Sequence, residues 1–171
     1  FSCFFPVTFS VHTSMCDVTD AIGHVGLSTE RVLISPEKNV KLTFWAHALT
    51  AESSVRAAGV RSKMTHHAVR AVALTRFGND AFMAPEQLQS SNASDMISDH
   101  MISDPSKIDV WSFGTVLWCL LERRPDGPFP TATAQQRGSF LNRGGRAIIS
   151  FQHPVLRSVL DLCWHTPPQE R

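Results

Sequence analysis

Phe82-Met83-Ala84-Pro85-Glu86 and Asp109-Val110-Trp111-Ser112-Phe113-Gly114 are the two stretches that decide the fold of this chain. The second stretch opens a run, 109–122, that carries apolar side chains on nearly every face of a predicted helix. A helix that is apolar all round lies buried in the middle of a domain. The following residues, 123–128 (RRPDGP), contain proline and glycine, which end a helix in a turn. The sequence therefore predicts a domain built around a central buried helix at 109–122.

Shorter patterns predict the elements on either side of this helix. Residues 32–34 (VLI) and 40–43 (VKLT) are typical of two short strands, and the polar residues between them predict a turn. After Pro154, apolar residues at helical spacing predict a last amphipathic helix at about 154–164. Few strands early in the chain and helices late favour an α+β fold that is mostly α.

The composition is that of a globular protein and excludes several classes. With 171 residues, of which 43% are hydrophobic and 18% charged, the chain can bury a core. A formal net charge of +1 gives no reason to expect nucleic acid or a membrane as a partner. The four cysteines stand far apart with no Cys-x-x-Cys pair, which favours reduced, buried thiols in a cytoplasmic protein: Cys3, Cys16, Cys119 and Cys163.

Together with 163–171, the two opening stretches resemble the large lobe of a eukaryotic protein kinase. The Cys163-Trp164-His165 ending is most similar to the tyrosine-kinase-like group. The resemblance covers residues 21–171 and leaves 1–20 as a segment of uncertain structure. It implies a buried ion pair between Glu86 and Arg171, because the family joins these two positions. It also implies that Asp109 accepts hydrogen bonds from the catalytic-loop backbone, a role compatible with capping the predicted helix.

These landmarks locate the other kinase positions in the chain. The strands 32–34 and 40–43 are similar to the pair that flanks the catalytic and metal-binding loops of the family. The equivalents are then 24–31 for the catalytic loop, 44–46 for the metal loop and 47–86 for the activation segment. The resemblance further implies structural roles for His24, which survives from the catalytic-loop motif, and for Trp45, which packs beside it. We also expect Trp111, Trp118 and Trp164 to be core residues and not a ligand platform.

The positions that carry catalysis in the family hold unsuitable residues here. Gly26 stands where the family has its catalytic Asp, Arg31 where it has the metal-binding Asn, and Phe44 where Asp-Phe-Gly begins. Phosphoryl transfer needs Mg²⁺ to bridge the phosphates and a carboxylate to orient the attacking hydroxyl. Glycine and phenylalanine supply no oxygen ligand, and an arginine side chain opposes a cation. We therefore expect no catalytic, cofactor-binding or metal-binding residue in the chain.

The resulting functional expectation is a pseudokinase, a protein-binding, scaffold or regulatory module without phosphoryl transfer. No Gly-x-Gly-x-x-Gly occurs and no Val-Ala-Ile-Lys strand precedes residue 24, so the small lobe is absent from these residues. Contact surfaces for protein partners are expected at 47–86 and in the Ser/Asp-rich loop 87–107. Two alternatives stay open: an atypical serine/threonine kinase of the tyrosine-kinase-like group that uses ATP and Mg²⁺ with a small lobe upstream, and a decayed gene fragment without function.

Two further features favour plain structural interpretations. His66, His67 and His100 lack a cysteine or acid at ligand spacing, so we expect surface histidines and no metal site. A phosphate switch in the activation-segment equivalent lacks its receptor, because Val25 replaces the catalytic-loop arginine. A solvated loop is the expectation for that segment.

Overall fold

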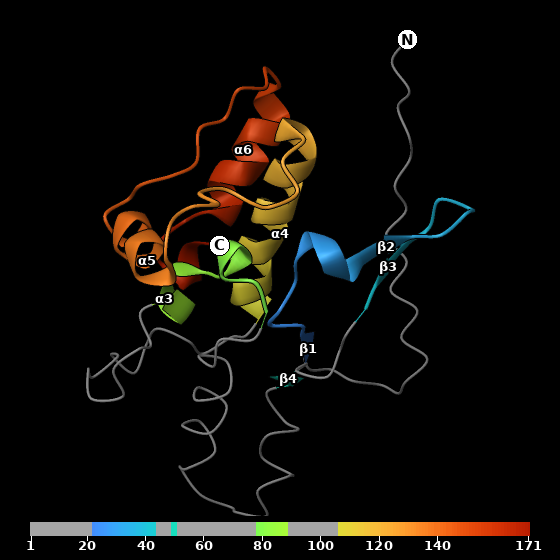
Figure 1. Ribbon diagram of the computed structural model, residues 1–171, viewed down its shortest axis with the longest axis horizontal. Helices are drawn as coiled ribbons and strands as arrows, with labels where there is room; N and C mark the ends of the chain where they lie inside the picture. The colour runs from blue at the N-terminus through green and yellow to red at the C-terminus, as the bar shows by residue number, and fades with distance from the viewer. Residues whose placement is uncertain (1–21, 44–48, 51–77, 89–105) are drawn as a thin grey trace, which may run out of the picture.

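The computed structural model describes residues 22–43, 49–50, 78–88 and 106–171, coloured in Figure 1. Their elements, in chain order, are β1 (Ile22–Gly23), η1 (Thr29–Arg31), β2 (Val32–Ile34), β3 (Val40–Leu42), β4 (Leu49–Thr50), η3 (Asp80–Phe82), α3 (Pro85–Leu88), α4 (Ser106–Glu122), α5 (Ala134–Asn142), α6 (Pro154–Cys163) and η4 (Pro168–Glu170). This described part is mostly helical, which agrees with the α+β, mostly α expectation.

The four described strands form two small antiparallel sheets. β2 pairs with β3, with Val32 opposite Leu42, which confirms the two short strands that the sequence predicted here. β3 ends at Leu42, one residue before the predicted end, and the Thr43 amide still donates to the Arg31 carbonyl oxygen (3.0 Å) in the register of the strand pair. The second pair, β1 with β4, was not predicted; these strands have two residues each and give no sequence pattern.

Helix α4 is longer and less completely buried than its composition predicted. It begins at Ser106, ahead of Asp109, and ends at Glu122. Its buried residues include Trp111, Val116 and Trp118, which lie in the hydrophobic cluster of the described residues. However, Leu120 is 67% exposed and Phe113 is 37% exposed, so the expectation that all faces are buried was wrong. Among the described elements, β1, η3, α6 and η4 pack against α4.

The close contact between α4 and α6 depends on a glycine. A Cβ atom added to Gly114 would lie 2.6 Å from the Cβ atom of Cys163, closer than two carbon atoms approach. Next to this contact, Trp164 Nε1 donates to Thr115 Oγ1 (3.3 Å). Helix α6 follows its prediction closely and ends at Cys163, with Trp164 as its C-cap. The predicted core tryptophans 111, 118 and 164 are all buried.

Helix α5 lies beside α3 (Figure 1) and was missed in the sequence, although a local signal was present. Thr133 caps the helix: its hydroxyl accepts from the Gln136 amide (3.2 Å), and the Gln136 side chain accepts from the Thr133 amide (2.9 Å). This reciprocal arrangement is the capping box, which the Thr-x-x-Gln spacing encodes. Gly144, at φ +83°, follows the end of the helix in the left-handed conformation that glycine adopts without strain.

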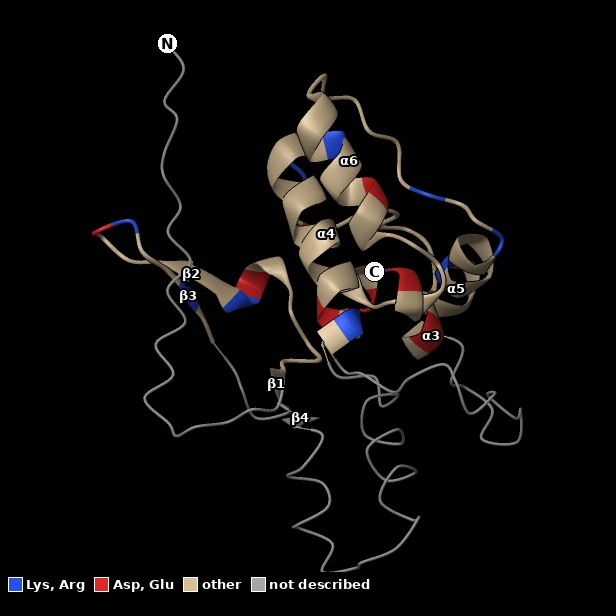
Figure 2. Cartoon of the chain, turned by 180° about the vertical axis from the view of Figure 1, so that it is seen from behind, with Lys and Arg blue, Asp and Glu red and all other residues tan. Residues whose placement is uncertain are grey.

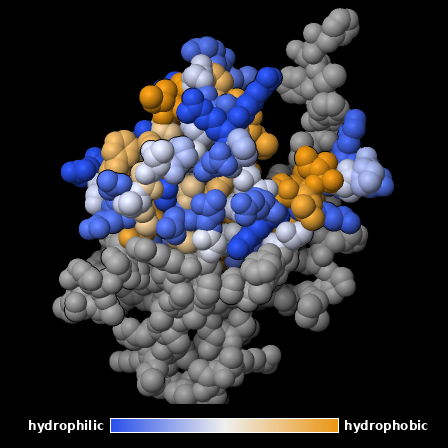
Figure 3. Space-filling view, viewed as in Figure 1, coloured by the Kyte–Doolittle hydropathy of each residue, from blue (hydrophilic) through white to orange (hydrophobic). Residues whose placement is uncertain are grey.

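The described surface has no dominant charge. Basic and acidic residues are interspersed over it (Figure 2), and apolar side chains reach the surface in small groups, including one at β2 (Figure 3). No described helix is long and apolar enough to cross a membrane. Cys119 and Cys163 are buried free thiols, as expected, whereas Cys3 and Cys16 lie outside the described residues.

Candidate functional site

The first part of the candidate site is the loop 24–28, which the carboxylate of Asp109 holds. The His24 amide donates to Asp109 Oδ2 (2.5 Å) and the Val25 amide donates to Oδ1 (2.8 Å). Asp109 lies within the first turn of α4, so its predicted role as the N-cap is wrong. A carboxylate near a helix N-terminus is favoured by the helix dipole. Here, the same carboxylate joins α4 to a loop that precedes it by more than eighty residues.

This attachment holds an unfavourable backbone conformation in place. Val25 has φ +61°, in the left-handed region that β-branched residues rarely adopt. Such a residue costs on the order of 1–3 kcal/mol and persists only where its surroundings enforce it. The Val25 side chain is buried, and the Val25 backbone amide is one of the two that donate a hydrogen bond to Asp109. Asp109 therefore fixes the conformation of the loop at the position where the family has an arginine.

His24 connects the same loop to the end of β3. Its Nδ1 accepts from the Gly26 amide (3.3 Å), and its Nε2 lies 2.9 Å from the Thr43 carbonyl oxygen, which can only accept. These two contacts require a proton on Nε2 and none on Nδ1. The buried imidazole ring thus connects the catalytic-loop equivalent to Thr43, which lies just before the metal-loop equivalent 44–46. Phe44 and Trp45, predicted to follow there, lie outside the described residues.

Gly26 and Arg31, two of the positions compared with the family's catalytic residues, both lie on this loop. Gly26 is buried and supplies only backbone groups, and the one carboxylate between residues 24 and 31 is Glu30, whose side chain is exposed. Arg31 ends η1, and its guanidinium lies beside Gly78, where an added Cβ atom would stand 3.3 Å from Arg31 Nη2. A cationic side chain thus occupies the outer end of the loop.

Glu86 and Arg171 form a buried, bidentate ion pair. Arg171 Nη1 donates to Glu86 Oε1 (2.7 Å) and Nη2 donates to Oε2 (2.9 Å). The side chains are 0% exposed for Arg171 and 2% exposed for Glu86. Arg171 also donates to the carbonyl oxygens of His165 (2.7 Å), Lys107 (3.2 Å) and Thr166 (2.9 Å). This one guanidinium therefore ties α3 to the start of α4 and to the end of the chain.

A second arginine, missed in the sequence, completes this side of the core. Arg146 donates to the Trp164 carbonyl oxygen through Nε (2.8 Å) and to the Gly145 carbonyl oxygen through Nη1 (2.7 Å). Its guanidinium lies 5.2 Å from the Trp111 ring centroid, and that of Arg171 lies 4.9 Å from it. Burial, and secondarily the nearby Arg171 charge, lowers the pKa of Arg146. Trp111 thus contacts two cations, which its sequence position alone did not predict.

The stretch 82–86 packs directly on α4. Ser112 Oγ donates to the Phe82 carbonyl oxygen (2.9 Å), and the Ala84 amide donates to Gln87 Oε1 (3.0 Å). All of the residues from 81 to 88 are buried. The expected loop 87–107 is corrected at both ends, because Gln87 and Leu88 belong to α3 and Ser106 and Lys107 belong to α4.

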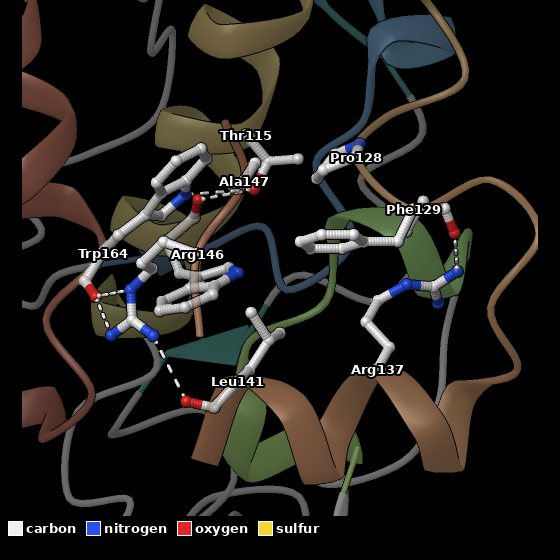
Figure 4. A pocket seen from close by; sticks show the side chains of 10 residues that line it. Thr115, Pro128, Phe129, Arg137, Leu141, Arg146, Ala147 and Trp164 are labelled. Carbon is white, nitrogen blue, oxygen red and sulfur yellow. Dashed lines mark hydrogen bonds between the residues drawn. The ribbon is translucent and has the colours of Figure 1, made fainter. Parts of the chain in front are cut away.

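A small cavity lies between α4, α5 and the 128–129 turn (Figure 4). Trp111, Phe129, Leu141 and Trp164 give it mostly apolar walls, and Arg137 and Arg146 also line it. Arg137 is 6% exposed, and burial lowers its pKa. A single arginine within α5 carries no sequence pattern that predicts burial, so this residue was missed.

Several sequence predictions fall where the structure gives no description. These are the segment 1–20, the metal-loop equivalent 44–46, residues 51–77 of the activation-segment equivalent and residues 89–105 of the predicted loop. The histidines 66, 67 and 100 belong to the same segments. Among the described residues, no group of three or more His, Cys, Asp or Glu side chains is placed to hold a metal ion.

Comparison with known proteins gives one clear assignment. A family model described as protein tyrosine and serine/threonine kinase matches residues 21–171. A search of curated proteins gave no significant match. The matched residues include the Asp109 contacts and the Glu86–Arg171 pair described above. The chain therefore belongs to the protein tyrosine and serine/threonine kinase family.

Proposed function

We propose that this chain is a pseudokinase domain of the tyrosine-kinase-like group that binds protein partners and does not transfer phosphate. The single observation that carries the proposal is Gly26, buried in the loop that Asp109 and His24 hold. In the family, this position carries the carboxylate that orients the attacking hydroxyl. Losing a general base commonly lowers a rate by about 10²–10⁴.

The residues present do not fit Mg²⁺ and ATP. The position that would supply a metal-binding amide is Arg31, and a fixed positive charge repels a divalent cation. Phe44, at the position of the second metal ligand, offers no oxygen. Without the metal, the charge that develops on the transferring phosphoryl group is not neutralised. No catalytic step is therefore assigned to this chain.

The architecture around the degenerate loop is intact, which supports a role as a binding module. Two long-range polar connections, Asp109 with the loop 24–28 and Glu86 with Arg171, hold the described core together. A domain that keeps such contacts without its catalytic groups can still present surfaces to a protein. We propose the activation-segment equivalent up to residue 80 and the residues 89–105 between α3 and α4 as these surfaces, because residues 81–88 are buried, and the cytoplasm as the location, on the sequence arguments given above.

The proposal is tested by thermal unfolding with ATP, with MgCl₂ and with both together. Neither nucleotide nor metal should raise the melting temperature, singly or in combination. A matched variant combines Gly26→Asp, Arg31→Asn and Phe44→Asp, which restores the family's side chains at all three positions. Stabilisation by Mg-ATP in the unaltered chain, absent with ATP alone, would contradict the proposal, as would phosphate transfer from radiolabelled ATP to a generic substrate protein.

The two alternatives make different predictions. An atypical kinase requires a glycine-rich loop and its lysine upstream of Phe1, so the longer sequence decides for or against it. A decayed fragment would not fold, so it would lack a cooperative thermal transition. The hydrophobic cluster around α4 and α6 supports a cooperative thermal transition, and it therefore argues against a decayed fragment.

A further inference from the structure

Helix α4 carries an apolar stripe that reaches the surface. Val110, Phe113, Leu117 and Leu120 follow one another at intervals of three or four residues, so they lie on one face of the helix. Leu120 is 67% exposed and Phe113 is 37% exposed, and Val110 and Leu117 are only partly buried. No charged residue occurs from Val110 to Leu121, so the stripe offers water nothing but apolar side chains.

Helix α6 widens this stripe into a larger apolar surface. The two helices pack against each other and run in opposite directions, as their colours show in Figure 1. Cys163 lies against Gly114 at their contact. Leu162 and Phe113 each precede these residues by one position, so in an antiparallel pair they lie on the same side of the contact. Leu162 is 60% exposed, and Val155, two helical turns before it, is 66% exposed. The stripe and these two α6 residues together form the α4–α6 face.

The α4–α6 face has the character of a docking surface. Single exposed apolar residues are normal, whereas contiguous apolar patches on a folded protein mark interaction sites. The core tryptophans of the same region, Trp111, Trp118 and Trp164, belong to the buried cluster on the other side of the helix pair. The α4–α6 face is therefore a second apolar surface, separate from the core.

The segment 1–21 joins the described structure at the edge of this face. Strand β1 follows it directly and packs against α4. The next residue, His24, donates its amide to Asp109 Oδ2 (2.5 Å). Asp109 precedes Phe113 by four residues, so the chain enters the described structure at the first turn of α4, in line with the stripe.

The composition and length of this segment match the face. Residues 1–21 contain no lysine or arginine, and six of the first eleven residues are phenylalanine or valine: Phe1, Phe4, Phe5, Val7, Phe9 and Val11. The stretch of α4 from Asp109 to Leu120 is about 17 Å long at a rise of about 1.5 Å per residue. Residues 12–21 reach about 33 Å when extended, so they can place the run 1–11 anywhere along it.

Attachment to the same chain favours this segment over a second copy of the protein. A segment on a short tether is present at an effective concentration in the millimolar range, without any new contact. A separate molecule reaches that concentration only in a very concentrated solution.

We propose that the apolar run 1–11 docks on the α4–α6 face of its own chain and covers Leu120, Val155 and Leu162. The docked segment keeps two molecules from associating through this face. The α4–α6 face includes none of the positions 26, 31 and 44, so the docking does not depend on whether the domain transfers phosphate.

Photo-cross-linking in the full 171-residue chain tests the docking. The photoreactive residue p-benzoylphenylalanine replaces Leu120 in one variant and, as the matched control, Ile148 in another. Ile148 is 87% exposed, and its carbonyl oxygen accepts from Trp118 Nε1 (2.9 Å), on the core side of α4. Mass spectrometry of mixed ¹⁵N-labelled and unlabelled protein shows whether a cross-link lies within one chain or joins two. The Leu120 variant should cross-link to residues 1–11 within one chain, and the Ile148 variant should not.

Melting temperatures give a second, independent measurement. If the run 1–11 covers Leu120, Leu120→Gln loses apolar burial and should lower the melting temperature by about 4–8 °C. Ile148→Gln changes an exposed side chain outside the face and should shift the melting temperature by less than about 2 °C.

Three cross-linking results would overturn the proposal. They are cross-links from position 120 that join two chains, cross-links that reach a different part of the same chain, and the absence of any cross-link. Equal melting temperatures for Leu120→Gln and Ile148→Gln would overturn it as well.

Discussion

Glu86→Gln is the substitution that tests the architecture most directly. It keeps the size of the side chain and removes the charge that pairs with Arg171, whose guanidinium is 0% exposed. Breaking a buried ion pair by removing one partner costs about 3–5 kcal/mol, because the remaining charge stays buried. Arg171 keeps three carbonyl acceptors and its contact with Trp111, which places the expected loss at the lower end, about 3 kcal/mol.

A loss of that size is large against the total stability of a domain. The free energy of unfolding of small domains is about 5–15 kcal/mol, so Glu86→Gln should remove a substantial fraction of it. For a chain of this length, the melting temperature should fall by about 6–12 °C. Urea unfolding followed by tryptophan fluorescence measures the effect, since Trp111 lies 4.9 Å from the Arg171 guanidinium.

Two further variants make the measurement specific to the pair. Glu30→Gln changes an exposed carboxylate and should alter the free energy of unfolding by no more than about 0.5 kcal/mol. The double variant Glu86→Gln, Arg171→Met leaves no unpaired charge, so its loss of stability should be smaller than the sum of the losses in the two single variants. An unchanged midpoint in Glu86→Gln, or additive losses in the double variant, would refute the assigned role of this ion pair.

Two other predictions concern α4. Asp109→Ala removes both acceptors for the His24 and Val25 amides. It should lower the free energy of unfolding by about 3–6 kcal/mol, since each hydrogen bond to a charged group contributes about 1.5–3 kcal/mol. Asp109→Asn keeps one acceptor and should lower it by less. Equal unfolding midpoints for the alanine variant and the unaltered protein would contradict the role given to Asp109. Burial raises the pKa of Cys119 from 9.0 to about 11, so the folded thiol holds its proton where the unfolded thiol loses it. Its contribution to stability is therefore complete below pH 9 and declines as the pH rises from 9 to 11, a slope that urea unfolding at several pH values should show and Cys119→Ala should reduce.

Local patterns were enough to predict several elements. The β2–β3 hairpin follows from two short strand-like runs around a polar turn, and helix α6 follows from helical spacing; both patterns depend only on neighbouring residues. The turn after Glu122 follows from Pro125 and Gly127, of which the glycine adopts φ +81°. The capping box of α5 belongs to the same class, since Thr133 and Gln136 stand three residues apart.

The family resemblance also predicted contacts between residues that are distant in the sequence. It implied that Glu86 meets Arg171 and that Asp109 meets the loop 24–28, and the structure contains both contacts. The roles of Gly26, Arg31 and Phe44 remain proposals, because they concern chemistry that geometry alone does not measure.

The sequence by itself indicated the family, the β2–β3 hairpin and the helices α4 and α6, and it is the basis for the proposal that the usual catalytic side chains are replaced. These properties depend on residue identity and on the spacing between nearby residues. Only the tertiary structure decided which face of α4 stays exposed at Phe113 and Leu120, and that Arg137 is buried beside a cavity. The physical reason is that burial and charge pairing depend on which distant segments pack around a side chain. No local pattern reports those neighbours.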